Sequence, residues 1–243
     1  MPRHRFFAPI SAFRDRDITL PPAESHHLSN VLRLGEGDCA NVFDGEGKEY
    51  ICTVLDAGMP SKLKIDEMIT GPVESPIRII LAQSLLKGEK FDLVVQKSTE
   101  LGVVSIIPIL TEHSEFRVHQ DSVSKRLERW NRISLEAVKQ CGRRRLVDIR
   151  APMTLEQSVR QAGPSLYFNQ RGGMPINLAL EETKHSKNIT LFVGPEGGWS
   201  EGEIAILRDN GAIGVTLGAR VLRAETAAIT AIALVQFLAG DLK

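Results

Sequence analysis

Two glycine-rich stretches near the C-terminus are the residues of this chain best suited to form a ligand site. The first, Gly194-Pro195-Glu196-Gly197-Gly198, follows the apolar run Ile189–Val193, and the second, Leu217-Gly218-Ala219-Arg220, also follows a short apolar run. In α/β proteins such loops lie at the carboxyl ends of strands, where glycines let the backbone approach a ligand closely. The two loops therefore predict one pocket built from both.

No nucleotide motif identifies the ligand. Neither loop matches G-x-G-x-x-G or G-x-x-x-x-G-K-[ST], the patterns that hold dinucleotides and nucleoside triphosphates. Gly and Pro also mark ordinary turns, so Gly194–Gly198 alone fits a plain turn as well as a binding loop. The presence of both loops favours the binding interpretation.

These loops belong to a longer series of motifs along the chain. The series is His26–Leu34, Phe43-Asp44-Gly45, Lys87–Lys90, Gln96–Val103 and Gln140–Arg143, followed by Gly194–Ile204 and Leu217–Ala227. In this order the sequence resembles the ribosomal RNA uridine-N3 methyltransferases, the RsmE family of the SPOUT class, over nearly its whole length. The resemblance implies a methyltransferase that uses S-adenosylmethionine to methylate N3 of a specific uridine in 16S ribosomal RNA of the small subunit.

The resemblance also assigns the cofactor pocket. It implies contacts from Leu191, Val193, Gly194, Gly198, Leu217, Gly218, Leu222, Arg223, Thr226 and Ala227. A pocket of backbone amides and small apolar side chains suits adenine and ribose, and the missing phosphate cradle agrees because this cofactor carries no phosphate.

Two residues of the second loop are candidates for catalysis, Arg223 and Glu225. A cation could stabilise the anion that develops on the uracil carbonyls when N3 loses its proton. Arg223 could equally form an ion pair with Glu225 or Glu196, and Glu225 could be structural. His26 and His27 are candidate bases by residue type, but we expect them to belong to the RNA-binding surface of the small domain or to its helix. The sequence identifies no general base.

Charge is distributed unevenly although the net charge is zero. The segment from Arg117 to Arg150 holds ten basic and four acidic residues. Adjacent like charges repel unless they have a partner, so the run Arg143–Arg145 suggests phosphate contacts. We expect RNA contacts from Arg3, Arg5, Arg33, Arg143, Arg144 and Arg145. For the charged segment Lys125–Arg132, the alternative is a helix surface that simply faces solvent.

Composition fits a globular protein, with 42% hydrophobic and 25% charged residues. No apolar run is long enough for a membrane span, and the start of the chain lacks the apolar core of a signal peptide. The three cysteines have no C-x-x-C spacing, so we expect neither disulfides nor a metal site, and a cytoplasmic location.

The chain divides at the Gly- and Pro-rich stretch Thr70–Pro76. We expect a β-rich domain over residues 1–72, with strands within 41–43, 50–55 and 62–65 and a helix within 23–33. The resemblance makes this a small PUA-like β-barrel that binds RNA. For residues 73–243 strands at 77–82, 105–110, 166–168 and 189–193 alternate with helices, which predicts an α/β domain with a parallel sheet and helices on both faces.

Three expectations concern the C-terminal part. Ser200 and Glu203 form a capping-box pattern that begins a helix. Thr226–Ala239 is apolar on nearly every face, which predicts a fully buried helix. The resemblance adds a trefoil knot from about Leu191 to the end and a homodimer with a cofactor pocket beside the two-fold interface, so that the small domain of one subunit could serve the active site of the other.

Two other functions stay open at this point. A knotted methyltransferase could act on transfer RNA or on another ribosomal position. A protein with this fold could also bind RNA or assist ribosome assembly without catalysis, although two intact glycine-rich loops count against that alternative.

Overall fold

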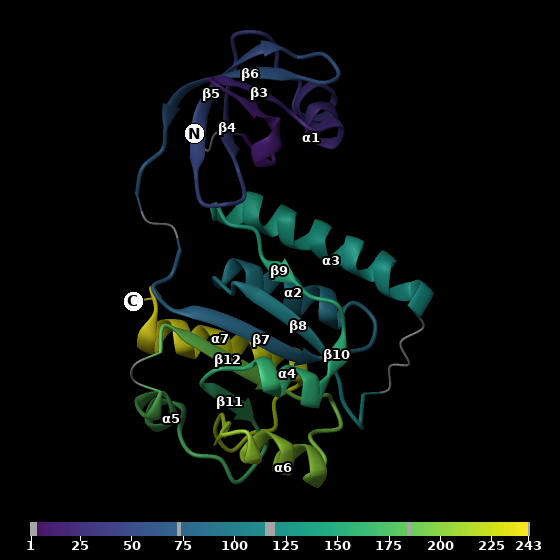
Figure 1. Cartoon of the computed structure of the whole chain (residues 1–243), viewed down its shortest axis with the longest axis vertical. Helices are drawn as coiled ribbons and strands as arrows, with labels where there is room; N and C mark the ends of the chain where they lie inside the picture. Colours follow the sequence, from purple (N-terminus) through teal and green to yellow (C-terminus); the bar gives the residue numbers. More distant parts are fainter. Residues whose placement is uncertain (1–3, 72–73, 115–119, 184–185, 243) are drawn as a thin grey trace. The chain divides into compact units, whose positions relative to one another are not determined.

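The structure is a computed structural model, and it describes residues 4–71, 74–114, 120–183 and 186–242. The chain forms two compact units (Figure 1). Unit 1 comprises Met1–Glu74 and Val138–Leu146, and unit 2 comprises Ser75–Ala137 and Val147–Lys243. The short segment 138–146 thus returns to unit 1, which the sequence pattern did not indicate.

Unit 1 is built on a six-stranded sheet in the order β1-β4-β5-β6-β3-β2. Its elements are β1 (Arg5–Phe7), the 3-10 turn η1 (Ile10–Ala12), β2 (Phe13–Arg14), β3 (Asp17–Thr19), α1 (Pro22–His26), the π-helical turn η2 (His27–Val31), β4 (Cys39–Phe43), β5 (Glu49–Asp56) and β6 (Lys62–Met68). β1 and β4 are parallel, and the other neighbours are antiparallel. The strand order is a path rather than a ring, so the closed barrel that we expected is not seen among the described residues.

The strands of unit 1 alternate between buried and exposed side chains, as expected for a sheet with one covered face. Phe6, Ile18, Val42, Val54 and Leu63 are fully buried in its core. Leu28 of η2 joins them, so the helical segment covers this face of the sheet.

Unit 2 is built on a sheet in the order β10-β8-β7-β12-β11-β13, with β9 paired to β8, and every neighbouring pair is parallel. Its strands are β7 (Arg78–Ser84), β8 (Ser105–Leu110), β9 (Asp148–Ile149), β10 (Met153–Thr154), β11 (Ser165–Phe168), β12 (Asn188–Val193) and β13 (Ile213–Val215). Its helices are α2 (Lys90–Glu100), α3 (Gln120–Cys141), α4 (Leu155–Gln161), α5 (Ile176–Glu182), α6 (Glu201–Asp209) and α7 (Ala224–Ala239). The last residues of α3 belong to unit 1.

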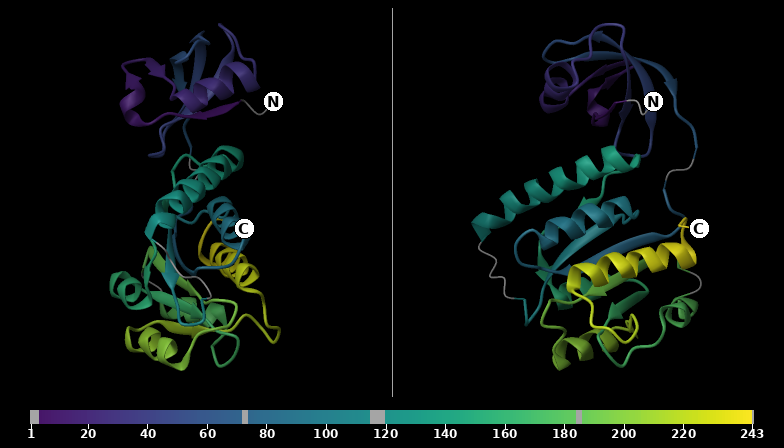
Figure 2. Two further views of the ribbon diagram at one scale, coloured as in Figure 1. Left: turned by 90° about the vertical axis from the view of Figure 1, so that its right-hand side faces the viewer. Right: turned by 180° about the vertical axis from the view of Figure 1, so that it is seen from behind.

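Helices cover both faces of this sheet, which confirms the predicted α/β class. One apolar core joins the sheet to α2, α3, α5 and α7, and a separate core on the other face joins it to α4 and α6 (Figures 1 and 2). Central strands such as β12 are buried along nearly their whole length, because helices pack on both sides of them.

One local prediction is confirmed with informative detail. Ser200 caps α6, because its hydroxyl accepts from the Glu203 amide while the Glu203 carboxylate accepts from the Ser200 amide. Pro108 lies inside β8, opposite Gln83 of β7 and between the residues that pair with β9 and those that pair with β10, so it marks neither a strand end nor the edge of the sheet. A residue without an N–H is tolerated there, where the neighbouring strand is interrupted.

The prediction of a fully buried C-terminal helix is wrong. α7 packs Ala228, Ala231, Ile232 and Val235 against the sheet. On its other face Phe237 is 59% exposed. The apolar sequence shows that the helix is hydrophobic. It does not show whether the exposed face of the helix is covered by this chain or by another chain.

Among the described residues, none of the helices combines the length and the apolar character that crossing a bilayer requires.

Candidate functional site

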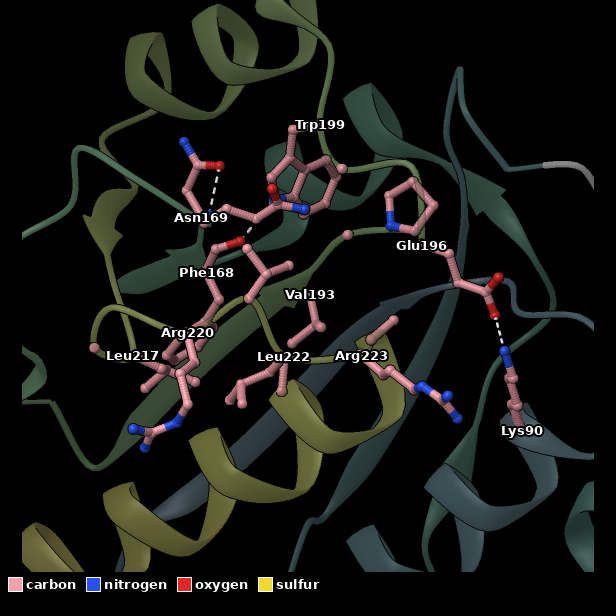
Figure 3. Close-up of a pocket in the computed structure, with 18 residues that line it drawn as sticks. Lys90, Phe168, Asn169, Val193, Glu196, Trp199, Leu217, Arg220, Leu222 and Arg223 are labelled. Carbon is pink, nitrogen blue, oxygen red and sulfur yellow. Dashed lines mark hydrogen bonds and ion pairs between the residues drawn. The ribbon is translucent and has the colours of Figure 1, made fainter.

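A hollow of about 430 Å³ lies at the carboxyl ends of β11, β12 and β13 (Figure 3). Its walls are the two glycine-rich loops, the residues that follow β11, and the start of α7. The parallel order of the strands brings these segments to one edge of the sheet, where ligands bind in open α/β folds. The residues that line it are Lys90, Phe168, Asn169, Gln170, Val193, Gly194, Pro195, Glu196, Gly198, Trp199, Leu217, Gly218, Arg220, Val221, Leu222, Arg223, Ala224 and Ala227.

The hollow brings together eight of the ten residues expected to contact the cofactor: Val193, Gly194, Gly198, Leu217, Gly218, Leu222, Arg223 and Ala227. Leu191 and Thr226 do not line it. Leu191 is fully buried inside β12 and packs in the apolar core, since it precedes the strand end by two residues. Thr226 is exposed in the first turn of α7, on a different side of the helix from Ala227.

Sequence reasoning missed the wall that follows β11. Phe168, Asn169 and Gln170 reach the hollow because β11 lies between β12 and β13 in the sheet. A signal was present, since an apolar strand ends there in two side-chain amides. The sequence alone did not indicate which strands are neighbours.

The two loops use their glycines for different reasons. A Cβ on Gly194 would lie 2.9 Å from the indole ring of Trp199, whose Nε1 donates to the Phe168 carbonyl at 2.9 Å. Gly194 therefore allows Trp199 to close the wall. Gly218 has a φ of +81°, and a Cβ there would meet no atom within 4 Å. A side chain on Gly218 would enter open space beside the hollow.

Lys90, Glu196 and Arg223 lie toward one end of the hollow, and Arg220 lies toward the other end (Figure 3). Lys90, at the start of α2, donates from Nζ to Glu196 Oε1 at 2.5 Å. Glu196 of the first loop is thus paired with Lys90 rather than with Arg223. Phe168, Asn169 and Leu217 lie toward the other end.

The two candidate catalytic residues lie in different environments. Arg223 is the N-cap residue of α7, exposed, and part of the wall of the hollow. Glu225 is buried in the first turn of α7 and does not line the hollow, and its Oε2 has no hydrogen-bond partner among the residues that the structure describes. Of these two residues, Arg223 is the one that lines the hollow.

Comparison with known proteins gives the same picture for both units. Residues 73–236 match a model of the RNA methyltransferase domain, and residues 20–67 match an RNA methyltransferase PUA domain. The ribosomal RNA small subunit methyltransferase E of Synechocystis sp. is 34% identical over 91% of this chain and 73% of its own length. The Bacillus subtilis protein of the same name is 28% identical and covers 90% of each chain.

The chain belongs to the ribosomal RNA small subunit methyltransferase E family.

Solved structures agree over the full length. A methyltransferase from Legionella pneumophila with bound S-adenosylmethionine superposes with a TM-score of 0.91 at 32% identity and covers 100% of both chains. The family member from Neisseria gonorrhoeae, also bound to S-adenosylmethionine, has a TM-score of 0.90 at 32% identity, covering 99% of this chain and 100% of its own.

The residues expected to contact RNA in this family member have unequal placements. Arg3 lies outside the described residues. Arg33 is exposed, with a φ of +56°. Arg5 is largely enclosed in unit 1, where its guanidinium donates to four carbonyls, those of Val138, Lys139, Gly142 and Arg143, and to the carboxylate of Glu49. Arg5 thereby satisfies carbonyls at the C-terminus of α3, where a cation is favourable.

The arginine run after Gly142 is mostly turned inward. Arg143 is 4% exposed and pairs with Glu74 at 2.8 Å, and Arg144 is 8% exposed and pairs with Glu49 at 3.1 Å. Arg145 is exposed. The adjacent charges are therefore compensated by glutamates within unit 1, and Arg145 is the member of the run whose side chain is exposed.

Glu49 is the centre of this charge cluster. Burial raises the pKa of its carboxyl, but hydrogen bonds and charge from Arg5, with further hydrogen bonds from Asn41 and Arg144, outweigh burial and hold the pKa below the ordinary 4.5. Because the folded pKa is lowered, the stability that Glu49 contributes is present above pH 4.5 and is lost as pH falls through the lower folded value.

Acidification should therefore weaken the fold of unit 1 through Glu49. We expect the urea midpoint of the wild-type protein to fall as pH decreases below 4.5. The Glu49→Gln variant should be less stable at neutral pH, and its midpoint should depend less on pH in the acid range. Equal acid slopes for both proteins would contradict the assignment of this pH dependence to Glu49.

Proposed function

We propose that this protein transfers a methyl group from S-adenosylmethionine to N3 of a specific uridine in 16S ribosomal RNA of the small subunit. As a family member it is an S-adenosylmethionine-dependent ribosomal RNA methyltransferase. The atom N3 and the single target nucleotide are the finer part of the proposal. They derive from the sequence resemblance, and the site supports them through its chemistry.

The hollow fits the cofactor. Its volume of about 430 Å³ is in the range of small-molecule sites. Leu217, Leu222 and Val193 offer apolar contacts, Asn169 and Gln170 offer amides, and the glycines open the backbone. S-adenosylmethionine supplies a methyl group already activated on a sulfonium, so the protein has to bind, orient and exclude water.

The reaction needs little covalent help from the chain. The uridine N3 would release its proton to solvent water and take up the methyl group that S-adenosylmethionine, held by Val193, Leu217 and Leu222, would supply, with the electron pair of the carbon–sulfur bond left on sulfur. The protein would assist by stabilising negative charge on the uracil ring, and of the three cations that line the hollow, Lys90, Arg220 and Arg223, we assign this task to Arg223 at the start of α7. Glu225 is proposed as a structural residue of the α7 start.

Calorimetry with S-adenosylmethionine tests the single observation that carries this proposal, the hollow between the two loops. We expect one cofactor per chain to bind. A folded protein that binds no cofactor would instead be an RNA-binding or ribosome-assembly protein.

RNA contacts are proposed for the exposed arginines. Arg33 and Arg145 of unit 1 can meet phosphates, and Arg3 stays in the proposal from the sequence. Arg5, Arg143 and Arg144 support this surface indirectly by holding segment 138–146 to unit 1. We also propose the trefoil knot beyond about Leu191 and a cytoplasmic location, in agreement with the family resemblance.

A homodimer completes the proposal, and the open face of α7 supports it. Phe237 and Leu238 are large, apolar and exposed on this helix, and Val221 is exposed in the loop that lines the hollow. An apolar surface beside a binding site commonly marks a protein interface. A partner subunit seated there would cover the open face and would lie next to the cofactor.

We predict a stable dimer at micromolar concentration that the Phe237→Glu/Leu238→Glu variant disrupts. A charge pair in the interface should weaken the dimer by more than about 30-fold, equivalent to about 2 kcal/mol, as for a buried aromatic hot spot. Methyl transfer should be lost with the dimer. Sedimentation equilibrium and a methylation assay measure the two effects.

The matched control is Leu55→Glu, which changes an exposed leucine of unit 1. It should leave the dimer intact. A wild-type species near the monomer mass of 26.8 kDa that still methylates ribosomal RNA would contradict both halves of the prediction.

A further inference from the structure

A second hollow, of about 400 Å³, adjoins the cofactor hollow and shares Pro195 and Glu196 with it. Its other walls include Leu85, Leu86 and Lys87, which follow β7, and His113, which follows β8. None of these four residues lines the cofactor hollow. The two spaces are thus neighbours separated by the first glycine-rich loop.

His113 is fixed against that loop. Its Nδ1 lies 3.1 Å from the carbonyl oxygen of Gly198, and a Cβ added to Gly197 would lie 3.0 Å from the His113 Cβ. A carbonyl oxygen only accepts hydrogen bonds, so Nδ1 carries the proton in this contact. The second ring nitrogen, Nε2, is therefore the atom that His113 can use toward a ligand.

Buried and half-buried hydrogen bonds hold the segment that carries His113. The Glu112 amide donates to Glu203 Oε1 at 2.8 Å, and the other carboxylate oxygen of Glu203 closes the capping box of α6. On the preceding side the hydroxyls of Ser84 and Thr111 lie 2.7 Å apart, and the Ser114 hydroxyl donates to the Thr111 carbonyl at 2.7 Å. The His113 backbone is positioned before any ligand arrives, as a binding site requires.

The second hollow combines an apolar wall with polar donors. Leu85 and Leu86 are each 3% exposed and, with Pro195, offer a surface for the face of a ring. Lys87 contributes a cation and His113 a ring nitrogen. Glu196, the acidic group shared by both hollows, has its charge compensated by Lys90. This chemistry suits a flat ring whose edge carries carbonyl oxygens and becomes negatively charged.

We propose that the second hollow receives the target nucleobase of the RNA, a pyrimidine with an imide edge, and that Lys87 and His113 hydrogen-bond to this edge. The inference rests on the proposed function. Glu196, which lines both hollows, lies with Lys90 at one end of the cofactor hollow (Figure 3), so this end is next to the second hollow. A base extruded from the RNA could thus reach the methyl group across the Pro195–Glu196 wall, as enzymes acting on bases require.

The test compares Lys87→Ala and His113→Ala with wild type. Small ribosomal subunits from cells that lack the gene serve as substrate, and calorimetry gives the affinity for S-adenosylmethionine. We expect methyl transfer at subsaturating subunits to fall about 10-fold to 100-fold in each variant, as for loss of a donor to a developing anion. Cofactor affinity should stay within about twofold, since neither side chain lines the cofactor hollow.

The matched control is Lys187→Ala, which removes an exposed lysine of the same unit that lines neither hollow. It should behave as wild type. Undiminished methylation by both variants of the second hollow would overturn the inference alone. Equal losses of cofactor affinity and methylation would overturn it too, because the space would then hold part of the cofactor. A wild-type protein that methylates no subunit would overturn both the inference and the proposed function.

Discussion

Gly218→Val should abolish S-adenosylmethionine binding while the protein stays folded. A Cβ at Gly218 meets no protein atom within 4 Å, so the new side chain would project into the space beside the cofactor hollow. The branched side chain and the ligand cannot share that space, and we expect the affinity to fall by more than about 100-fold. Calorimetry measures the affinity, and circular dichroism reports whether the fold is kept.

Backbone strain needs a separate control, because Gly218 has a φ of +81° and Val at positive φ is strained by about 1–3 kcal/mol. Gly211 offers a close match. It has a φ of +79°, its Cβ would also meet nothing within 4 Å, and it lies just after α6, away from the hollow. Gly211→Val should be destabilised to a similar extent and should bind the cofactor normally. Wild-type affinity in a folded Gly218→Val protein would remove this loop from the cofactor site.

The Arg144→Ala substitution should cause the second large effect, a decrease in the free energy of unfolding of the protein. Arg144 Nε donates to Glu49 Oε2 at 3.1 Å, and Nη1 donates to the Gly71 carbonyl, with both side chains of the ion pair largely buried. Removing one partner of a buried pair leaves the other charge poorly compensated. We expect a loss of about 3 kcal/mol in the free energy of unfolding, the lower end for such a change because Arg5 still pairs with Glu49. Urea titration followed by far-ultraviolet circular dichroism measures it.

Arg145→Ala is the matched control next in sequence. Arg145 is exposed, so its loss should change the free energy of unfolding by less than about 0.5 kcal/mol. As a proposed phosphate contact it should instead weaken RNA binding and reduce the salt dependence of that binding. An Arg144→Ala variant that is as stable as wild type but binds RNA more weakly would contradict this assignment. Arg144 would then contact RNA phosphates instead of pairing with Glu49.

The contrast between these two arginines shows where the sequence was sufficient and where it was not. Adjacent like charges correctly indicated that the run needs partners. The partners of Arg143 and Arg144 are Glu74 and Glu49, which are 69 and 95 positions away in the sequence. Pairing over such distances depends on the tertiary fold, so the sequence could suggest phosphate but could not reveal the internal carboxylates.

Elements with strong local signals were predicted well. The run Ser105–Leu110 forms β8 over those residues, and the Ser200 capping box begins α6. The short strands β1, β2 and β3 were missed because each has only two or three residues and is held by pairing with distant partners. α4 was also missed, although Thr154 and Gln157 form a second capping box, whose pattern is present in the sequence.

The candidate site divides in the same way. The glycine-rich loops lie within one short stretch of sequence, and they correctly indicated one hollow. Lys90, Asn169 and His113 are brought to that edge of the sheet only by strand order. The sequence therefore did not predict the site residues that belong to no glycine-rich loop, because only the order of the strands in the sheet brings them to the site.

The most direct test of the central claim is a mass map of the methylated product. Wild-type protein, S-adenosylmethionine with a labelled methyl group and small ribosomal subunits from cells lacking the gene are incubated together. The 16S ribosomal RNA is then digested, and its nucleosides and fragments are analysed. We predict label in 3-methyluridine at one position of the RNA. Label on another atom, on transfer RNA alone, or on no RNA would contradict it.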